Sequence, residues 1–184
     1  MAPLRGRLAS SSSHPADTIL PTPDPLSARL TKRHRIRLDI SGYGRSGETW
    51  FVTVATLHRD QVPLLRPEVA EVMCSSLTSA HDIYRCDLLA YCVMPDHLHV
   101  VTHVRDGGDL IKLINGFKSY STRTWWGVGG SGTLWQRSFH DHGLRTLADV
   151  EASLAYIWEN PIRWGLHDDD GHYPWMGGTL LEDV

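Results

Sequence analysis

AYCVMPDHLHVVTHV (residues 90–104) consists of two apolar runs that meet at a Pro-Asp corner. Two such runs on either side of a turn-forming pair predict a β-hairpin whose second strand begins at His97. This second strand carries three histidines, His97, His99 and His103. Alternate side chains of a strand point to the same face, so the three imidazoles share one face. Each must find a polar partner there, because burying an unpaired polar group is costly.

The sequence around this hairpin predicts alternating strands and helices. In chain order we expect a strand over 49–58, a helix over 65–82, hairpin strands over 86–94 and 97–104, a helix over 108–126, an extended edge over 133–145 and a helix over 146–160. The first six elements match the β-α-β-β-α-β plan of a ferredoxin-like fold. The expected fold class is therefore α+β, an antiparallel sheet with an added C-terminal helix.

Local signals predict where two of these helices begin and end. Pro67 falls in the first turn of the helix over 65–82, where a missing backbone N–H costs least. Thr146 is the expected N-cap of the last helix, and Asp149 stands in a capping-box position. Pro161 is expected to end that helix, because the residue before a proline is pushed out of helical geometry.

Composition indicates one globular domain with flanking segments. The 184 residues are 41% hydrophobic. No apolar run approaches the roughly 20 residues that a membrane helix needs. We expect a disordered leader over 1–30, which is rich in Ser, Pro and Ala, a domain over 31–175 and an acidic tail over 176–184. Three cysteines without CxxC spacing favour reduced thiols in the cytoplasm.

The formal net charge of −3 requires that any contacts with nucleic acid be local. Residues 165–184 hold five acidic residues and no Lys or Arg, which accounts for the acidic balance. TKRHRIRLDISGYGR (residues 31–45) is basic, with five Lys or Arg against one Asp. This segment either contacts phosphates or is a solvated arm. The candidate phosphate contacts are Lys32, Arg33, Arg35 and Arg37.

His97 and His99 flank one outward residue, Leu98, and can bind one divalent metal ion between them. Such a pair leaves coordination positions open, which suits polarising a phosphate oxygen or activating a nucleophile. His103 lies too far along the strand to join them. The alternative is two core histidines with ordinary hydrogen-bond partners. The tight corner before His97 places it near the rim of the sheet, which favours an accessible site.

Two tyrosines compete for the role of nucleophile, and helical phase separates them. Tyr120 continues the apolar stripe of the helix over 108–126, so it is expected to pack in the core or at its rim. Tyr156 lies away from the apolar stripe that runs from Leu147 to Ile157, and Asn160 shares its face. One helix face therefore presents a phenol and an amide together, away from the packing. An exposed tyrosine and a helix-ending asparagine would give the same pattern.

MPDHLHVV resembles the His-hydrophobe-His motif of the IS200-like tyrosine transposases, and YIWENPIRWGL resembles the signature around their nucleophile. TWFVTVAT and LWQRSFHDHGLR fit the REP-associated branch of that family. The resemblance covers the chain from Arg33 to Trp175. It implies a ferredoxin-like fold whose C-terminal helix carries the nucleophile. The implied site consists of Tyr156 as nucleophile and of His97, His99 and Asn160 as ligands of Mg²⁺ or Mn²⁺.

The implied reaction is transesterification on single-stranded DNA, with hairpins from repetitive extragenic palindromes as the expected partner. Tyr156 forms a 5′-phosphotyrosine and frees a 3′-hydroxyl, and a 3′-hydroxyl later rejoins the strand without ATP. A phenol with a pKa of about 10 is a poor nucleophile, so metal polarisation of the phosphate is needed. Trp125 and Trp126 offer rings for base stacking, against the alternative of packing at a helix end. The oligomeric state is open between a monomer and a homodimer.

Two other functions are open. A domesticated DNA-binding module would keep the fold and lose turnover. A metalloprotein that uses His97, His99 and His103 would bind a transition metal tightly and would need no Tyr156. All the residues for the transposase chemistry are present, which favours the enzyme.

Overall fold

The computed structural model describes residues 46–61, 63–169 and 172–181. The expected leader over 1–30 and the basic segment over 31–45 lie outside these residues. The strands are β1 (Thr49–Ala55), β2 (Cys86–Met94), β3 (His97–Val104), β4 (His140–Leu144) and β5 (Met176–Gly177). The helices are α2 (Pro67–Ile83), α3 (Leu110–Gly127) and α4 (Leu147–Arg163), with short 3-10 turns η2 (Arg59–Gln61) and η3 (Pro63–Leu65).

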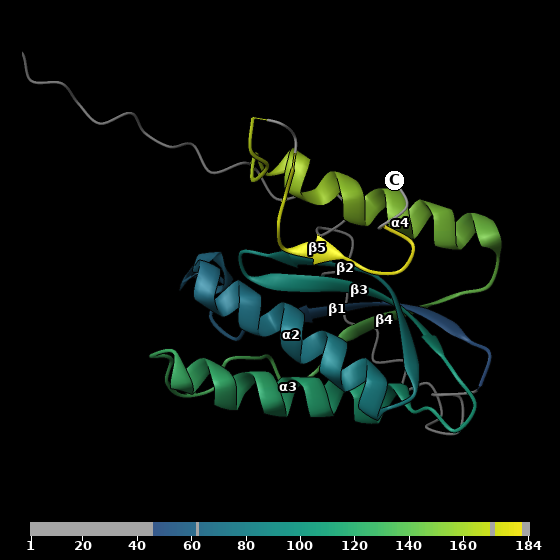
Figure 1. The fold of residues 1–184 in the computed structure, drawn as a ribbon, viewed down its shortest axis with the longest axis horizontal. Helices are drawn as coiled ribbons and strands as arrows, with labels where there is room; N and C mark the ends of the chain where they lie inside the picture. Colours follow the sequence, from purple (N-terminus) through teal and green to yellow (C-terminus); the bar gives the residue numbers. More distant parts are fainter. Residues whose placement is uncertain (1–45, 62, 170–171, 182–184) are drawn as a thin grey trace, which may run out of the picture. The chain divides into compact units, whose positions relative to one another are not determined.

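The five strands form one antiparallel sheet in the order β4-β1-β3-β2-β5 (Figure 1). The two central hairpin strands have the predicted ends, and Met94 pairs with His97 across the Pro-Asp turn. The expected α+β, ferredoxin-like arrangement is confirmed. The added C-terminal helix, α4, is present, and β5 adds an edge strand that the sequence did not predict.

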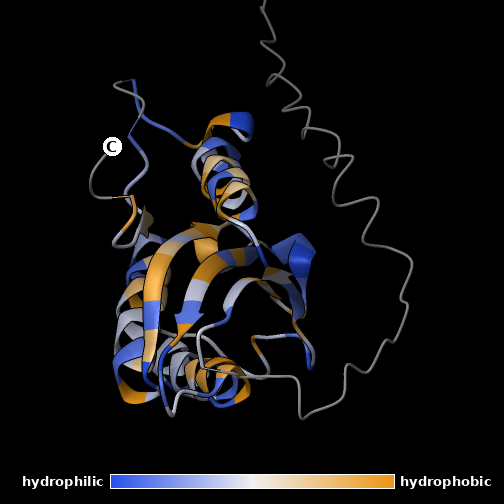
Figure 2. Cartoon of the chain, turned by 90° about the vertical axis from the view of Figure 1, so that its right-hand side faces the viewer, coloured by the Kyte–Doolittle hydropathy of each residue, from blue (hydrophilic) through white to orange (hydrophobic). Residues whose placement is uncertain are grey.

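Both faces of the sheet are covered. Helices α2 and α3 lie on one face and α4 on the other (Figures 1 and 2). Alternate residues of β1 and β3, such as Val52 and Val100, pack into the core beneath α2 and α3, while Val101 packs with Ile157 of α4. Leu98 was expected to point outward, but it is fully buried in the α2–α3 core. The reason is that a strand covered on both faces has no outward side.

The helix starts agree with their local signals. Pro67 is at the first position of α2, and Thr146 caps α4 with a complete capping box that includes Asp149. The predicted stop at Pro161 is wrong, because α4 continues to Arg163. Proline removes one N–H donor only, and the helix closes its last turn with a bond from Trp164 N to the carbonyl of Asn160. Pro161 is also buried, so the last turn is held by packing.

The chain after α4 returns along the free edge of β2. The hydroxyl of Tyr173 donates to the carbonyl of Val93 at 2.6 Å, and β5 pairs with Tyr91 and Cys92. Thr179 and Leu180 then donate their backbone N–H groups to β2. Among the described helices, none has the length and apolar character needed to cross a membrane.

Candidate active site

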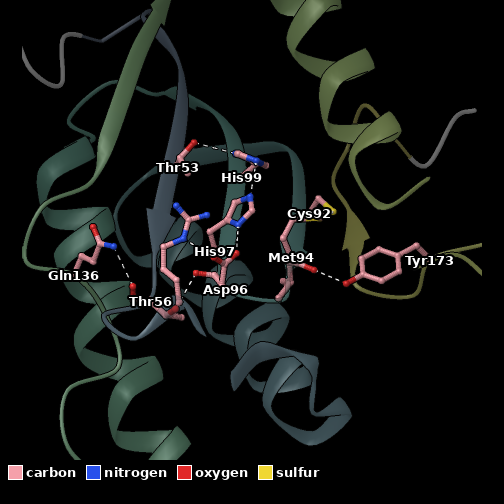
Figure 3. A network of polar contacts seen from close by, with 11 residues as sticks. Thr53, Thr56, Cys92, Met94, Asp96, His97, His99, Gln136 and Tyr173 are labelled. Atoms are coloured by element: carbon pink, nitrogen blue, oxygen red, sulfur yellow. Dashed lines mark hydrogen bonds and ion pairs between the residues drawn. The ribbon is translucent and has the colours of Figure 1, made fainter. Parts of the chain in front are cut away.

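His97 and His99 face each other at the start of β3. Their Nε2 atoms are 3.0 Å apart. Nδ1 of His97 lies 2.6 Å from Oδ1 of Asp96, and Nδ1 of His99 lies 2.9 Å from the hydroxyl of Thr53 (Figure 3). Each imidazole is thus held through Nδ1 and turns Nε2 towards the other ring. The sequence placed His97 at an accessible rim, whereas both residues are buried, at 7% and 4% exposed.

These hydrogen bonds determine which ring nitrogen carries a proton. A carboxylate only accepts, so Nδ1 of His97 donates to Asp96, and Nε2 of the neutral ring presents a lone pair. A second ring nitrogen at 3.0 Å then needs a proton or a cation between the two. Two ligand atoms at right angles on an octahedral ion, each about 2.1 Å from it, stand about 3 Å apart. The pair therefore fits a divalent ion, and a carboxylate behind a ligating histidine is a common support for one.

Asp96 supplies the fixed negative charge of this group. Burial opposes its ionisation, but hydrogen bonds from His97 and from Nε of Arg59 outweigh that cost and lower the carboxyl pKa to about 2. The pKa of His99 lies well below its ordinary value, because the ring is buried and stands beside His97. At neutral pH the site therefore combines an ionised carboxylate with a neutral His99, the form that can ligate a metal.

The sequence did not assign a role in this site to Asp96, and it did not indicate Thr53, Thr56 or Arg59. Thr53 is the cross-strand partner of His99, so the register of β1 against β3 could have identified it. Thr56 donates both its backbone N–H and its hydroxyl to the carbonyl of Asp96, at 2.8 and 2.9 Å. Arg59 lies in the irregular turn η2 after β1, and its pairing with Asp96 depends on a loop path that no local pattern reveals.

Tyr156 lies beside the histidine pair. Its ring centroid is 5.2 Å from that of His99 and 5.8 Å from that of Phe51, and both contacts are edge to face. Phe51 also contacts His99, with centroids 5.2 Å apart. Three rings from α4, β1 and β3 thus form one cluster. Both histidines and this tyrosine thus meet in the described part of the chain.

The face of α4 that carries Tyr156 and Asn160 packs on the sheet, although the sequence placed it away from the packing. Asn160 is 4% exposed, whereas Leu147, on the expected apolar stripe, is 74% exposed. The fully buried residues of α4 lie in its C-terminal half. Val150 and Leu154 of the expected stripe are partly buried against the core, and only Leu147 of that stripe faces solvent. Nδ2 of Asn160 donates to the carbonyl of Tyr156 at 2.8 Å, which orients the amide one turn after the phenol.

Tyr120 was expected to pack in the core, but it is half exposed. Phe117 is buried as predicted, and Ser121 rather than Tyr120 continues the buried stripe of α3. At 100° per residue, Ser121 lies about 40° from Phe117, while Tyr120 lies about 60° from it on the other side. Tyr120 lines a groove between α2 and α3, which cover the opposite face of the sheet from Tyr156.

His103 stands apart from the pair, as expected. Its Nδ1 atom is 3.0 Å from the hydroxyl of Thr49, at the far end of the strand pair. Within the described ranges, no three His, Cys, Asp or Glu side chains gather as a metal site. A third ligand for an ion between His97 and His99 would therefore be of another type, which Asn160 could supply.

The expected DNA contacts divide into two groups. The first group lies outside the described residues and consists of Lys32, Arg33, Arg35 and Arg37. The second is at the end of α3, where half-buried Trp125 packs over Gly130 so closely that a Cβ there would lie 2.1 Å from the indole. Trp126 is 49% exposed, and its indole N–H donates to the carbonyl of Gly132 at 2.8 Å. Helix-end packing thus accounts for Trp125, while the ring of Trp126 is open to solvent.

Several known proteins are similar to this chain. It is 25% identical over 143 residues to the REP-associated tyrosine transposase of Escherichia coli (strain K12), over 77% of this chain and 82% of that protein. The fold is similar to the structure of the REP-associated tyrosine transposase bound to a REP hairpin. That likeness has a TM-score of 0.64 at 24% identity, over 77% of this chain and 82% of that chain. The family model for the IS200-like transposases matches residues 51–160, more than half of the chain. This range holds His97, His99, Tyr156 and Asn160, and the chain belongs to the IS200-like transposase family.

Proposed function

We propose that the chain is a metal-dependent tyrosine transposase that cuts and rejoins single-stranded DNA at hairpins. The position of the Tyr156 ring against His99, whose Nε2 faces Nε2 of His97, is the observation that carries this proposal. A phenol beside two converging imidazoles supplies a nucleophile next to a place for a cation. Membership of a transposase family supports the same class of chemistry.

His97, His99 and Asn160 would hold the metal ion, which we propose to be Mg²⁺ or Mn²⁺. The ion would polarise a phosphate oxygen and so make the phosphorus easier to attack. Asp96 keeps His97 in the tautomer whose Nε2 can ligate, and Thr53 holds the ring of His99. The amide oxygen of Asn160 would add the oxygen ligand that these hard ions favour.

Tyr156 is the proposed nucleophile. Its Oη forms a bond to phosphorus as the bond from phosphorus to the 3′ oxygen breaks. The phenol loses its proton and the departing oxygen gains one, which leaves a 5′-phosphotyrosine and a 3′-hydroxyl. A 3′-hydroxyl then attacks the same phosphorus, the bond to Oη breaks, and the DNA is rejoined without ATP.

Single-stranded DNA in a palindromic hairpin is the proposed partner. The similar REP-associated transposase was solved with a REP hairpin bound, which supports this choice. Because the histidines and Tyr156 meet within one chain, a monomer suffices for the chemistry, and a homodimer would carry two sites. The proposed location is the cytoplasm, because Cys74, Cys86 and Cys92 are free thiols and the proposed substrate is DNA.

A strand-cleavage assay tests the proposal with a matched pair of variants. End-labelled single-stranded hairpin DNA is incubated with the protein and Mg²⁺ or Mn²⁺, and the products are separated on a denaturing gel. We expect a covalent protein–DNA band for the native protein and for Tyr120→Phe, and none for Tyr156→Phe. Each variant loses one hydroxyl only. A band that persists in Tyr156→Phe would exclude this nucleophile, and DNA binding without any band would identify a binding module.

A further inference from the structure

Arg59 is joined to the histidine pair by one carboxylate. Its Nε donates to Oδ2 of Asp96, and the other oxygen of Asp96 accepts from Nδ1 of His97 at 2.6 Å. A continuous chain of contacts thus runs from Arg59 through Asp96 and His97 to Nε2 of His99. Arg59 has no part in the chemistry proposed above.

Asp96, which holds Arg59, is itself fixed by backbone and side-chain hydrogen bonds. The carbonyl of Asp96 accepts both the N–H and the hydroxyl of Thr56, and the carbonyl of Thr56 accepts from the side-chain amide of Gln136 at 3.1 Å (Figure 3). The side chain of Asp96 is 9% exposed, while that of Arg59 is 51% exposed. The buried carboxylate therefore holds one side of the guanidinium, and the rest of the group reaches solvent.

Guanidinium chemistry shows what the exposed side can bind. An arginine has five N–H donors in a planar fork, and Nε uses one of them here. The four remaining donors are on the terminal nitrogens, and the described part of the chain provides no acceptor for them. Such a fork matches two oxygens of a phosphate, and a held guanidinium loses little freedom when it binds.

We propose that Arg59 is a binding subsite for a backbone phosphate of single-stranded DNA, held in place by Asp96. This inference rests on the proposed function for the identity of the ligand. The bound phosphate would belong to the strand that passes the histidine pair, because Arg59 is two contacts away from His97. Asp96 thereby orients a metal-facing histidine with one oxygen and a phosphate-binding group with the other.

The test measures DNA binding apart from cleavage. Each protein carries Tyr156→Phe and is free of metal, and the affinity for fluorescent single-stranded hairpin DNA is measured by anisotropy over a range of salt. Arg59→Gln should weaken binding at least about tenfold. It should also reduce the slope of log K against log salt by about 0.7, the value for one phosphate contact on single-stranded DNA. Arg105→Gln is the matched control, since Arg105 also pairs through Nε with a carboxylate, that of Asp87, at the far end of β3.

A buried carboxylate without its arginine can destabilise the fold, so a second variant is needed. The double change Arg59→Gln with Asp96→Asn removes both charges and keeps an oxygen acceptor for His97. It should show the same reduction in slope. An unchanged slope in the folded double variant, or an equal reduction in Arg105→Gln, would overturn the inference.

A scan of the DNA identifies the phosphate. Single uncharged methylphosphonates replace the phosphates of the strand one at a time. Replacement at one position should weaken binding to the protein that retains Arg59 and should not change binding to the Arg59→Gln protein. If each methylphosphonate weakened binding equally in both proteins, the phosphate subsite at Arg59 would be excluded, and the proposed cleavage would be unaffected. No binding of single-stranded DNA by either protein would count against the proposed function as well.

Discussion

The two histidines of the site are held by different partners, and each partner sets what its ring can offer. Asp96 can only accept a hydrogen bond, so His97 must present the lone pair of Nε2. Thr53 can donate or accept, so His99 is free to adopt the tautomer that a metal requires. The hydrogen-bond partners of the two rings, as well as their spacing in the sequence, therefore support the proposed metal-binding pair.

Removal of either imidazole should abolish metal binding at this pair. We expect His97→Ala and His99→Ala each to weaken Mn²⁺ binding by more than about 100-fold, because loss of a ligand costs more than loss of a supporting residue. His103→Ala is the control on the same strand face, since His103 bonds to Thr49 instead. Titration calorimetry with Mn²⁺ measures the three affinities, and circular dichroism checks that each variant is folded. Tight binding that depends on His103 would show that the ligand set is wrong.

At the scale of elements, the sequence predicted the strands, the helices and most residues of the apolar stripes, but it did not predict that the face of α4 with Tyr156 and Asn160 also packs on the sheet. The hairpin strands have clear ends because a Pro-Asp turn separates two long apolar runs. The helical phase of α4 correctly placed Tyr156 and Asn160 on one face. The apolar residues of the helix alone did not reveal that this polar face lies on the sheet. Burial at Asn160 depends on how the helix crosses the sheet, and that is a property of the assembled fold. Arg59 and Thr56 were missed for the same reason, since they meet Asp96 across 37 and 40 residues of chain.

The contact between α2 and β3 contains a histidine that the proposed chemistry does not use. His81 is 2% exposed, with Nδ1 2.8 Å from the carbonyl of Leu77 and Nε2 3.1 Å from the hydroxyl of Thr102. Burial lowers its pKa from 6.5 to about 4, although the nearby Asp82 and Asp87 partly oppose the shift.

This histidine should make the fold sensitive to acid. Between pH 6.5 and 4 the unfolded chain binds a proton at His81 and the folded chain does not, so stability falls as the pH is lowered through that window. The expected loss is on the order of 3 kcal/mol. Urea unfolding at several pH values measures it, and His81→Gln should lose much less stability over the same window. Equal acid sensitivity in the two proteins would contradict this explanation.

At the scale of the whole molecule, the order of elements was sufficient to predict a ferredoxin-like sheet, and the last strand was not predictable. β5 consists of two residues in a segment with Gly and Pro, so it has no alternating pattern to detect. β5 forms because the backbone of this segment makes hydrogen bonds with the open edge of β2. We propose residues 31–175 as the transposase domain, with 1–30 as a leader and 176–184 as an acidic tail whose first residues complete the sheet.

The basic segment before the described residues is predicted to add to DNA affinity. Neutralising Arg33, Arg35 and Arg37 together should weaken binding to hairpin DNA. It should also reduce the salt slope by about 2, since each contact with single-stranded DNA contributes about 0.7. Anisotropy titrations over a range of salt measure both quantities. An unchanged slope would mean that the segment is a solvated arm, and the phosphate contacts would then have to come from the folded domain.

Mapping the covalent adduct identifies the residue that attacks the DNA. The protein is incubated with single-stranded hairpin DNA and Mn²⁺, then digested with nuclease and trypsin, and the peptides are analysed by mass spectrometry. Cleavage after Arg145 and Arg163 places Tyr156 alone among tyrosines in one peptide, whereas Tyr120 falls in the peptide that ends at Arg123. We expect a nucleotide on Tyr156 and an unmodified Tyr120 peptide. A nucleotide on any other residue, or cleaved DNA with no modified peptide, would contradict it.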